Sequence, residues 1–215
     1  LAVLMQPTPA ETAEPPATGT LEGKVTIKKK GKAMKSSAHV VVYLEDVPGP
    51  VPRGVTTEAQ IRQLDKKFLP EINVVMKGNS VAFPNEDDFF HNVFSVSRPA
   101  RFDLGLYRSG ESRSVKFKRP GVVDIYCNIH PDMMAKVKVV PSRYFAVSDA
   151  KGNFKLDGVP AGTYPYVAWY ANGEEVTGQV TIPANGSAQL DIEVKHKSSA
   201  DYHLRKDGTP YGRYK

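Results

Sequence analysis

Apolar and polar residues alternate in short runs along much of this chain. In one run, Val123, Ile125 and Cys127 occupy every second position, which predicts a strand with one buried face. Residues 135–140 alternate again and would place Val137 and Val139 inward and the lysines outward. The two runs therefore predict a β-hairpin whose tip carries Cys127, His130 and Met133.

Similar apolar runs, separated by turn residues, occur before and after this hairpin. They cover residues 21–27, 39–45, 144–148, 153–156, 164–170, 176–182 and 187–194. Each run has the length of a strand, and the 17 glycines and 17 prolines indicate many turns between them. The pattern predicts an all-β fold, and the length of 215 residues allows one large or two small domains.

The beginning of the chain has a different character. Residues 1–5 are apolar, as in the remnant of a signal peptide, and residues 6–20 are rich in Pro, Ala, Thr and Glu, as in a disordered linker. We therefore expect a leader remnant and linker over residues 1–19, and a protein exported to the periplasm or the cell exterior. No run reaches the roughly 18 apolar residues of a membrane helix, so no transmembrane segment is expected.

Positive charge is concentrated in two regions, within a net charge of +6. The first region is a group of lysines beside an early turn: Lys28, Lys29, Lys30, Lys32 and Lys35. The second is a basic tail over residues 196–215, which is either disordered or an arm that packs on a partner. These regions could steer an acidic redox partner, bind a polyanion or simply be solvated. No zinc-ligand spacing, aromatic RNA-binding strand or basic helix indicates a nucleic-acid partner.

The candidate chemistry lies at the tip of the predicted hairpin. Cys127 is the only cysteine, and His130 and Met133 follow it within the next six residues. One thiolate, two imidazoles and one thioether are the ligands of a blue-copper electron-transfer site, and His91 supplies the second imidazole from another strand end. Soft sulfur donors hold Cu(I) and imidazoles suit both oxidation states, so this set limits rearrangement when an electron moves. The predicted ligands of a single copper ion are His91, Cys127, His130 and Met133.

Two features of this site stay open in the sequence. Met134 directly follows Met133 and offers an alternative thioether. Residues 86–88, Glu-Asp-Asp, lie just before His91, where a carboxylate could change the coordination of a metal ion. We expect this acidic turn to be solvated instead. Structural or surface roles are expected for the remaining histidines, His39, His196 and His203.

Residues 59–140 resemble a cupredoxin domain, the Greek-key β-sandwich of plastocyanins, pseudoazurins and amicyanins. The resemblance rests on FFHNVFS at residues 89–95 and on GVVDIYCNIHPDMMAKVKVV at residues 121–140. The Cys-x2-His-x2-Met spacing is similar to the short amicyanin loop. The resemblance implies the same four type 1 copper ligands, and it implies that Asn92 helps to hold the loop and the cysteine sulfur.

Residues 146–170 resemble a second family, the transthyretin-like β-sandwich found as a carboxypeptidase regulatory domain. We expect residues 20–46 and 141–195 to form one such small sandwich, with the cupredoxin domain of residues 47–140 inserted between them. Alternatively, the first two strands extend an edge of the cupredoxin sheet. A copper domain combined with a small second domain also resembles the cupredoxin-like proteins labelled methylamine utilisation proteins.

Together these features predict an electron carrier rather than an enzyme. The copper ion would cycle between Cu(I) and Cu(II), with electrons passing through His130 at an apolar patch around Pro131 and Met134. The expected partner is a redox protein such as a c-type cytochrome or a periplasmic dehydrogenase. A single type 1 centre lacks the second copper needed to reduce oxygen or nitrite, which argues against catalysis. Copper storage or delivery, and a structural or interaction role in an exported assembly, are the alternatives.

Overall fold

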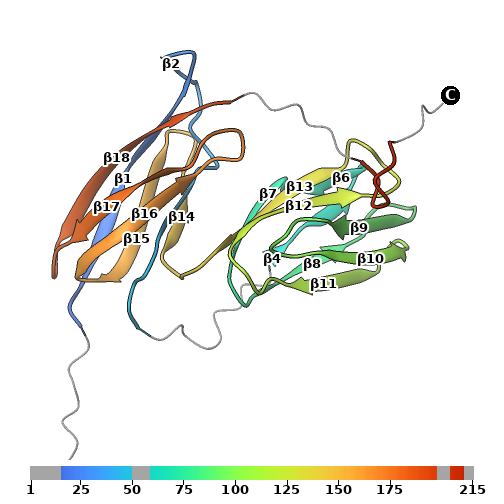
Figure 1. Cartoon of the computed structure of the whole chain (residues 1–215), viewed down its shortest axis with the longest axis horizontal. Helices are drawn as coiled ribbons and strands as arrows, with labels where there is room; N and C mark the ends of the chain where they lie inside the picture. Colours follow the sequence, from blue (N-terminus) through green and yellow to red (C-terminus); the bar gives the residue numbers. More distant parts are fainter. Residues whose placement is uncertain (1–15, 50–58, 198–203, 211–215) are drawn as a thin grey trace, which may run out of the picture.

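The chain forms two β-sheet lobes that lie side by side (Figure 1). A computed structural model describes residues 16–49, 59–197 and 204–210. In these residues the regular secondary structure consists of β-strands alone, which confirms the predicted all-β fold. Across the same residues, no helix has the length and apolarity needed to span a membrane. The predicted leader remnant and most of the predicted linker, residues 1–15, lie outside the described part of the chain.

Two four-stranded sheets form the first lobe. The first sheet has the order β15–β1–β18, with β2 paired to β1. Its strands are β1 (Thr18–Lys29), β2 (Lys32–Ala33), β15 (Asn153–Pro160) and β18 (Ser187–Lys195). The second sheet has the order β14–β3–β16–β17. Its strands are β3 (Val41–Leu44), β14 (Phe145–Val147), β16 (Gly162–Trp169) and β17 (Val176–Ile182).

Strands from opposite ends of the chain therefore share both sheets of this lobe. Strand β1 runs antiparallel to β15 and parallel to β18, and β3 lies between β14 and β16. The apolar faces of the two sheets form one buried core, which includes Leu21, Val42, Leu156 and Ile192. The relation of this lobe to the transthyretin-like family, and the predicted domain bounds, stay predictions.

The second lobe is built around a five-stranded sheet with the order β10–β9–β12–β13–β7. Its strands are β7 (Ile72–Met76), β9 (His91–Ser95), β10 (Phe102–Tyr107), β12 (Gly121–Cys127) and β13 (Met134–Val140). A three-stranded sheet, β11–β8–β4, and a small hairpin, β5–β6, complete the lobe. These strands are β4 (Ala59–Gln60), β5 (Arg62–Leu64), β6 (Lys67–Leu69), β8 (Ser80–Pro84) and β11 (Ser112–Lys116).

Strands β12 and β13 form the hairpin that the alternating sequence predicts. They pair antiparallel, with Val123 opposite Val137 and Tyr126 opposite Met134. The inward residues Val123, Ile125 and Cys127 are fully buried in the core of this lobe. Burial of every second side chain thus orients the strand and turns its last residue, the cysteine, into the protein.

A third apolar cluster joins the two lobes. It consists of Val41, Tyr43, Met76, Val140, Val167 and Trp169, and it combines strands β3 and β16 of the first lobe with β7 and β13 of the second. Because β13 packs against the core on one face and against this cluster on the other, its final residues are buried on both faces. The cluster therefore couples the sheet that carries the hairpin to the first lobe.

The prediction that the lysines of residues 135–140 point to solvent is wrong for Lys138. Its side chain is only 3% exposed and lies in the interface between the lobes. Lys138 Nζ lies 2.5 Å from a carboxylate oxygen of Glu175 and within 5.4 Å of the ring centroids of Tyr43 and Trp169. The ion pair and the two ring faces replace the water that the ammonium group loses on burial.

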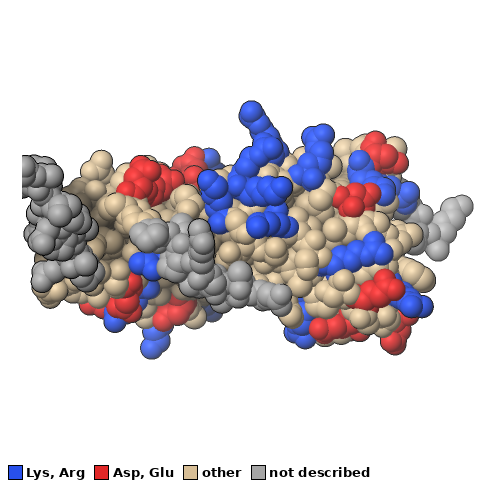
Figure 2. Space-filling model, turned by 90° about the horizontal axis from the view of Figure 1, so that it is seen from below, with Lys and Arg blue, Asp and Glu red and all other residues tan. Residues whose placement is uncertain are grey.

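Charged side chains are unevenly distributed over the surface. Figure 2 shows Lys and Arg gathered near the middle of one face, with most acidic side chains toward either side. In the predicted lysine group, Lys28 forms an ion pair with Glu193 of the neighbouring strand β18. An acidic redox partner for these charges stays a prediction.

Part of the basic tail is ordered and lies on its own chain. Residues 204–210 sit at the end of the second lobe (Figure 1), where Lys206 contacts Asn128 and Asp103. Over these seven residues the tail thus contacts its own chain, and packing on a partner stays a prediction. Residues 198–203 and 211–215 lie outside the described part of the chain.

Candidate metal centre

Strand pairing brings the predicted ligands to one end of the second lobe. Cys127 is the last residue of β12, and His91 is the first residue of the neighbouring strand β9. The two strands pair with Cys127 opposite Val93, so His91 lies two residues from the cysteine across the sheet. Both side chains are fully buried. His91 thus comes from a second strand end, as the sequence predicts.

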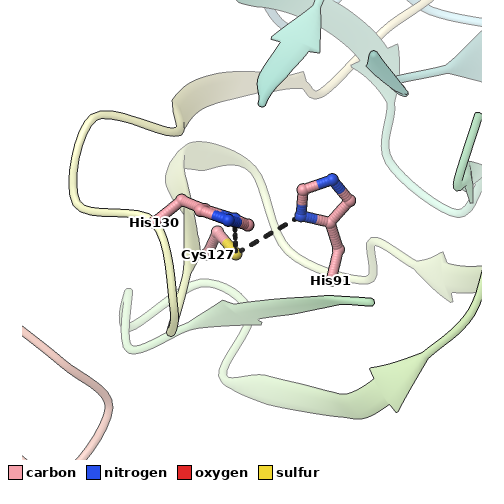
Figure 3. A group of neighbouring side chains, drawn as sticks. All are labelled: His91, Cys127 and His130. Carbon is pink, nitrogen blue, oxygen red and sulfur yellow. Dashed lines mark hydrogen bonds between the residues drawn. The ribbon is translucent and has the colours of Figure 1, made fainter. Parts of the chain in front are cut away.

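The loop after Cys127 is closed by its own backbone. The amide of Cys127 donates to the carbonyl of Met133 at 3.2 Å, and the amide of Met133 donates to the carbonyl of His130 at 3.2 Å. This tight turn directs the His130 ring back over the cysteine sulfur (Figure 3).

Three donor atoms converge at this point. Cys127 Sγ lies 3.8 Å from His91 Nδ1 and 3.6 Å from His130 Nδ1, and all three atoms lie within 4.8 Å of one another (Figure 3). Nitrogen and sulfur ligands at about 2.0–2.1 and 2.3 Å from a shared tetrahedral ion would be roughly 3.6 Å apart. The donors present therefore fit one metal ion, and thiolate with imidazoles suits copper.

The two methionines occupy different environments. Met133 is fully buried in the same core cluster as Cys127. Met134 starts strand β13 and is only partly buried, and it shares the outward face of the strand with Lys136. Burial on the side of the cysteine favours Met133 over Met134 as the thioether that could join the three donors.

Asp87 contradicts the expectation of a solvated acidic turn. Its side chain is only 6% exposed, and its Oδ2 accepts a hydrogen bond from His91 Nε2 at 2.7 Å. The two carboxylate oxygens also accept from the backbone amides of Asp65 and Lys66, at 2.7 and 3.1 Å. Both of these residues have positive φ and form the two-residue turn between β5 and β6.

The contacts of Asp87 determine how His91 can act. Burial by itself raises the pKa of Asp87, but the hydrogen bonds from His91 and the two amides outweigh it and hold the pKa below its ordinary value. The ionised carboxylate keeps the ring proton on Nε2, so the free lone pair of Nδ1 faces the sulfur. Such a carboxylate–histidine pair fixes the orientation of a metal ligand and increases its basicity.

Asn92 links the two strand ends, in the position that the sequence indicated. Its backbone amide interacts with the thiol sulfur of Cys127, and its side-chain Nδ2 donates to Asp103 Oδ1 at 2.7 Å. Asn92 itself is 2% exposed, so the donor groups of both interactions are buried. The residue thus ties strand β9 both to the sulfur and to strand β10.

Phe89 is a surface residue of the site that sequence reasoning missed. Its ring is 39% exposed and lies 5.2 Å from the His91 ring and 5.7 Å from the His130 ring, centroid to centroid. The neighbouring Phe90 is 55% exposed. The available signal in the sequence was the pair of consecutive phenylalanines directly before the predicted histidine. Both are exposed in the structure, and large apolar side chains at a surface often mark a contact site.

Burial controls the protonation of the two remaining donors. Burial raises the pKa of the Cys127 thiol, although the backbone amides of Asn92, Ile129 and His130 partly oppose this effect. Burial also lowers the pKa of His130 below its ordinary value of 6.5; the positive charge of Lys66 acts in the same direction, and the negative charge of Asp87 opposes it. In the metal-free protein at neutral pH, the thiol is therefore protonated and the His130 ring is neutral.

Metal binding is consequently expected to release a proton from Cys127. Because only the thiolate binds a metal ion, the apparent affinity should rise about tenfold for each pH unit between about pH 6.5 and 8. A chelator-competition titration across this range, with the released protons counted in weak buffer, checks the slope. A slope of zero would contradict the assignment of the thiol as a ligand, and Cys127→Ser should remove the proton release.

The chain was also compared with known proteins. No protein-family model matches it. Amicyanin-alpha from Methylorubrum extorquens is 34% identical to it over 87 residues, which make up 39% of this chain and 71% of that protein.

Three solved structures also match part of the chain. A purple cupredoxin from Nitrosopumilus maritimus shares 23% identity, with a TM-score of 0.35, over 38% of this chain and 99% of that one. A reduced amicyanin variant shares 22% identity, with a TM-score of 0.37, over 46% of this chain and 98% of that one. A copper-containing nitrite reductase from Thermus scotoductus shares 25% identity, with a TM-score of 0.37, over 43% of this chain and 23% of that one.

Proposed function

The chain belongs to the cupredoxin family through an amicyanin-like domain, and from this premise we propose that it carries single electrons on one copper ion. The convergence of His91, Cys127 and His130 supports this proposal, because three donors of the required types lie within 4.8 Å of one another. The proposed ligand set is completed by the buried thioether of Met133. Copper bound there would supply one-electron chemistry by cycling between Cu(I) and Cu(II).

The residues around the donors favour fast electron exchange. His91, Cys127 and Met133 are fully buried, so a metal ion between them would be shielded from water and from external ligands. Asp87 and the closed loop hold the donors in place, which limits rearrangement when the charge changes. His130 is only partly buried, so its ring is the proposed route for electrons to the surface.

The same burial bears on the alternatives. A copper-delivery protein needs sulfur ligands that an acceptor can reach, whereas both sulfur atoms here belong to fully buried side chains. An enzyme that acts through its metal ion needs an open coordination position for a substrate, and the four proposed ligands would leave none. We therefore favour a carrier over a delivery protein or an enzyme. An interaction role in an exported assembly, and export itself, stay predictions from the sequence.

The spectrum of the protein loaded with Cu(II) tests this function. We expect a strong sulfur-to-copper absorption band in the visible range and narrow copper hyperfine splitting in the electron paramagnetic resonance spectrum. His91→Ala should remove both, whereas the matched variant His39→Asn changes an exposed histidine and should preserve them. A colourless wild-type protein with ordinary Cu(II) spectra would refute the type 1 site.

The proposed partner is a redox protein, such as a c-type cytochrome or a periplasmic dehydrogenase, that docks where His130 reaches the surface. The exposed ring of Phe89 extends this face beside His130, in addition to the patch predicted around Pro131 and Met134. Aromatic side chains of this kind contribute strongly to protein interfaces.

Phe89→Ala is therefore expected to slow electron exchange with such a partner by about tenfold, since removal of an interface anchor typically costs more than 1 kcal/mol. Stopped-flow measurement of the second-order rate constant with a c-type cytochrome checks this. Val96→Ala is the control, because Val96 is also exposed but follows the far end of β9. Equal rates for the two variants would show that Phe89 is not part of the docking face.

A further inference from the structure

The described part of the C-terminal tail is a folded turn. The amide of Arg205 donates to the carbonyl of Thr209 at 2.9 Å, and the amide of Gly208 donates back to the carbonyl of Arg205 at 2.9 Å. Asp207 Oδ1 accepts from the amide and the hydroxyl of Thr209, at 2.9 and 2.7 Å. These local bonds give residues 204–210, named here the C-terminal arm, a defined shape at the end of the second lobe (Figure 1).

Lys206 attaches this arm to the segments that carry two of the metal donors. Its backbone amide donates to Asn128 Oδ1 at 3.0 Å, and Asn128 directly follows Cys127 in the loop. Its Nζ donates to Asp103 Oδ2 at 2.6 Å. One residue, 78 positions after Asn128, thus contacts both the loop and strand β10.

Asp103 connects Lys206 to Asn92, which lies at the strand end that carries His91. While Oδ2 accepts from Lys206, Oδ1 accepts from Asn92 Nδ2 at 2.7 Å and from the amide of Gly105 at 2.9 Å. Asn92 directly follows His91, and its own amide interacts with the cysteine sulfur. Lys206 is therefore connected to the neighbour of Cys127 directly, and to the neighbour of His91 through one carboxylate.

The charge of Asp103 supports this connection at neutral pH. Burial by itself raises the pKa of Asp103, but the hydrogen bonds from Lys206, Asn92 and Gly105 outweigh it and hold the pKa below its ordinary value. The carboxylate is therefore ionised and can accept from all three groups together. Because the two side chains of the ion pair are 43% and 40% exposed, the pair alone is weak, and its effect depends on the joined network.

We infer that the C-terminal arm is a positioning element of the metal centre, in which Lys206 fixes the loop of Cys127 relative to the strand end of His91. The inference rests on the proposed function, because positioning matters only if these donors bind a metal ion. Lys206 touches neither donor and acts through Asn128 and through Asp103 with Asn92. The last part of the chain thus stabilises a site whose ligands all lie more than 70 positions earlier in the sequence.

The first test uses the copper-free protein. In a variant that ends at residue 203, and in Lys206→Ala, we expect faster amide hydrogen exchange in residues 128–133 and at Asn92 than in the full chain. Lys206→Arg keeps a cationic donor and should restore slow exchange. Lys197→Ala is the matched control, because it removes a lysine from an exposed ion pair with Glu174 in the first lobe. Unchanged exchange in the shortened chain would overturn the inference.

The second test adds copper. It distinguishes an arm that positions the metal ligands from an arm that only packs against the loop. Loss of the arm should raise the copper dissociation constant about tenfold, the lower end of the effect of residues that support metal ligands. It should also change the copper hyperfine splitting and the reduction potential, with Lys206→Arg close to the full chain. Faster exchange with an unaltered affinity, spectrum and potential would overturn the positioning role.

The two tests also distinguish the inference from the proposed function. If the full chain shows no type 1 spectrum, the proposed function fails, and the positioning role fails with it even where the exchange results hold. If the full chain shows the spectrum and the shortened chain matches it in affinity, potential and exchange, the positioning role alone is overturned.

Discussion

Cys127→Ser is expected to abolish the visible absorption of the copper-loaded protein and to weaken copper binding by about a hundredfold or more. The absorption requires a sulfur–copper bond, which a serine hydroxyl cannot replace. The loss in affinity follows because a four-ligand metal site is worth about 10–16 kcal/mol in total, so one strong ligand accounts for several kcal/mol. Visible spectroscopy and chelator competition measure the two effects.

The fold of this variant should survive, which makes the result interpretable. Serine is close to cysteine in size, and burying its hydroxyl at this fully buried position should cost about 1–3 kcal/mol of the free energy of unfolding. Thermal unfolding of the metal-free variant checks this cost. Met134→Leu is a useful second control, since it alters the partly buried methionine while retaining Met133. An undiminished visible band in Cys127→Ser would refute the ligand assignment.

Asp87→Asn is expected to weaken copper binding by about 10–100-fold while leaving all four proposed ligands in place. An asparagine can still accept one hydrogen bond from His91 Nε2, but it lacks the negative charge that increases the basicity of the ring. It also has one acceptor oxygen where the carboxylate offers two, so the turn at Asp65 and Lys66 loses a partner. Loss of the charge should also raise the reduction potential, because a nearby anion stabilises Cu(II) more than Cu(I).

The neighbouring Asp88 provides a matched control for this prediction. Asp88→Asn makes the same change in charge at an exposed position one residue away. Copper titration and redox potentiometry should show a small effect for Asp88→Asn and a large one for Asp87→Asn. Equal effects of the two substitutions would show that overall charge near the site, rather than the contact with His91, is responsible.

Much of this site could be predicted from the sequence because its information is local. Alternation with a period of two identifies strands β12 and β13 and places Cys127 on the inward face at a strand end. The order and spacing of Cys127, His130 and Met133 within one loop restrict the donors to a small volume. The residue types then indicate a soft metal, because thiolate, thioether and imidazole are the donors that copper prefers.

The environments of Asp87 and Lys138 could not be predicted in this way, because each side chain depends on partners that are distant in sequence. Asp87 looked solvated within an acidic run, yet the turn between β5 and β6 covers it and His91 binds it. Lys138 looked outward on an alternating strand, yet the first lobe packs over it. In each case a second element buries a charged side chain and supplies its partner.

The sequence by itself determined the all-β class and the hairpin, and it indicated the residues that we propose as donors, since these follow from local periodicity and residue chemistry. The tertiary structure decided which strands share a sheet, in which register β1 and β3 pair with strands from the second half of the chain, and where Lys206 meets Asn128. These arrangements arise from packing between elements that lie far apart in the chain, for which alternation within a single strand carries no information.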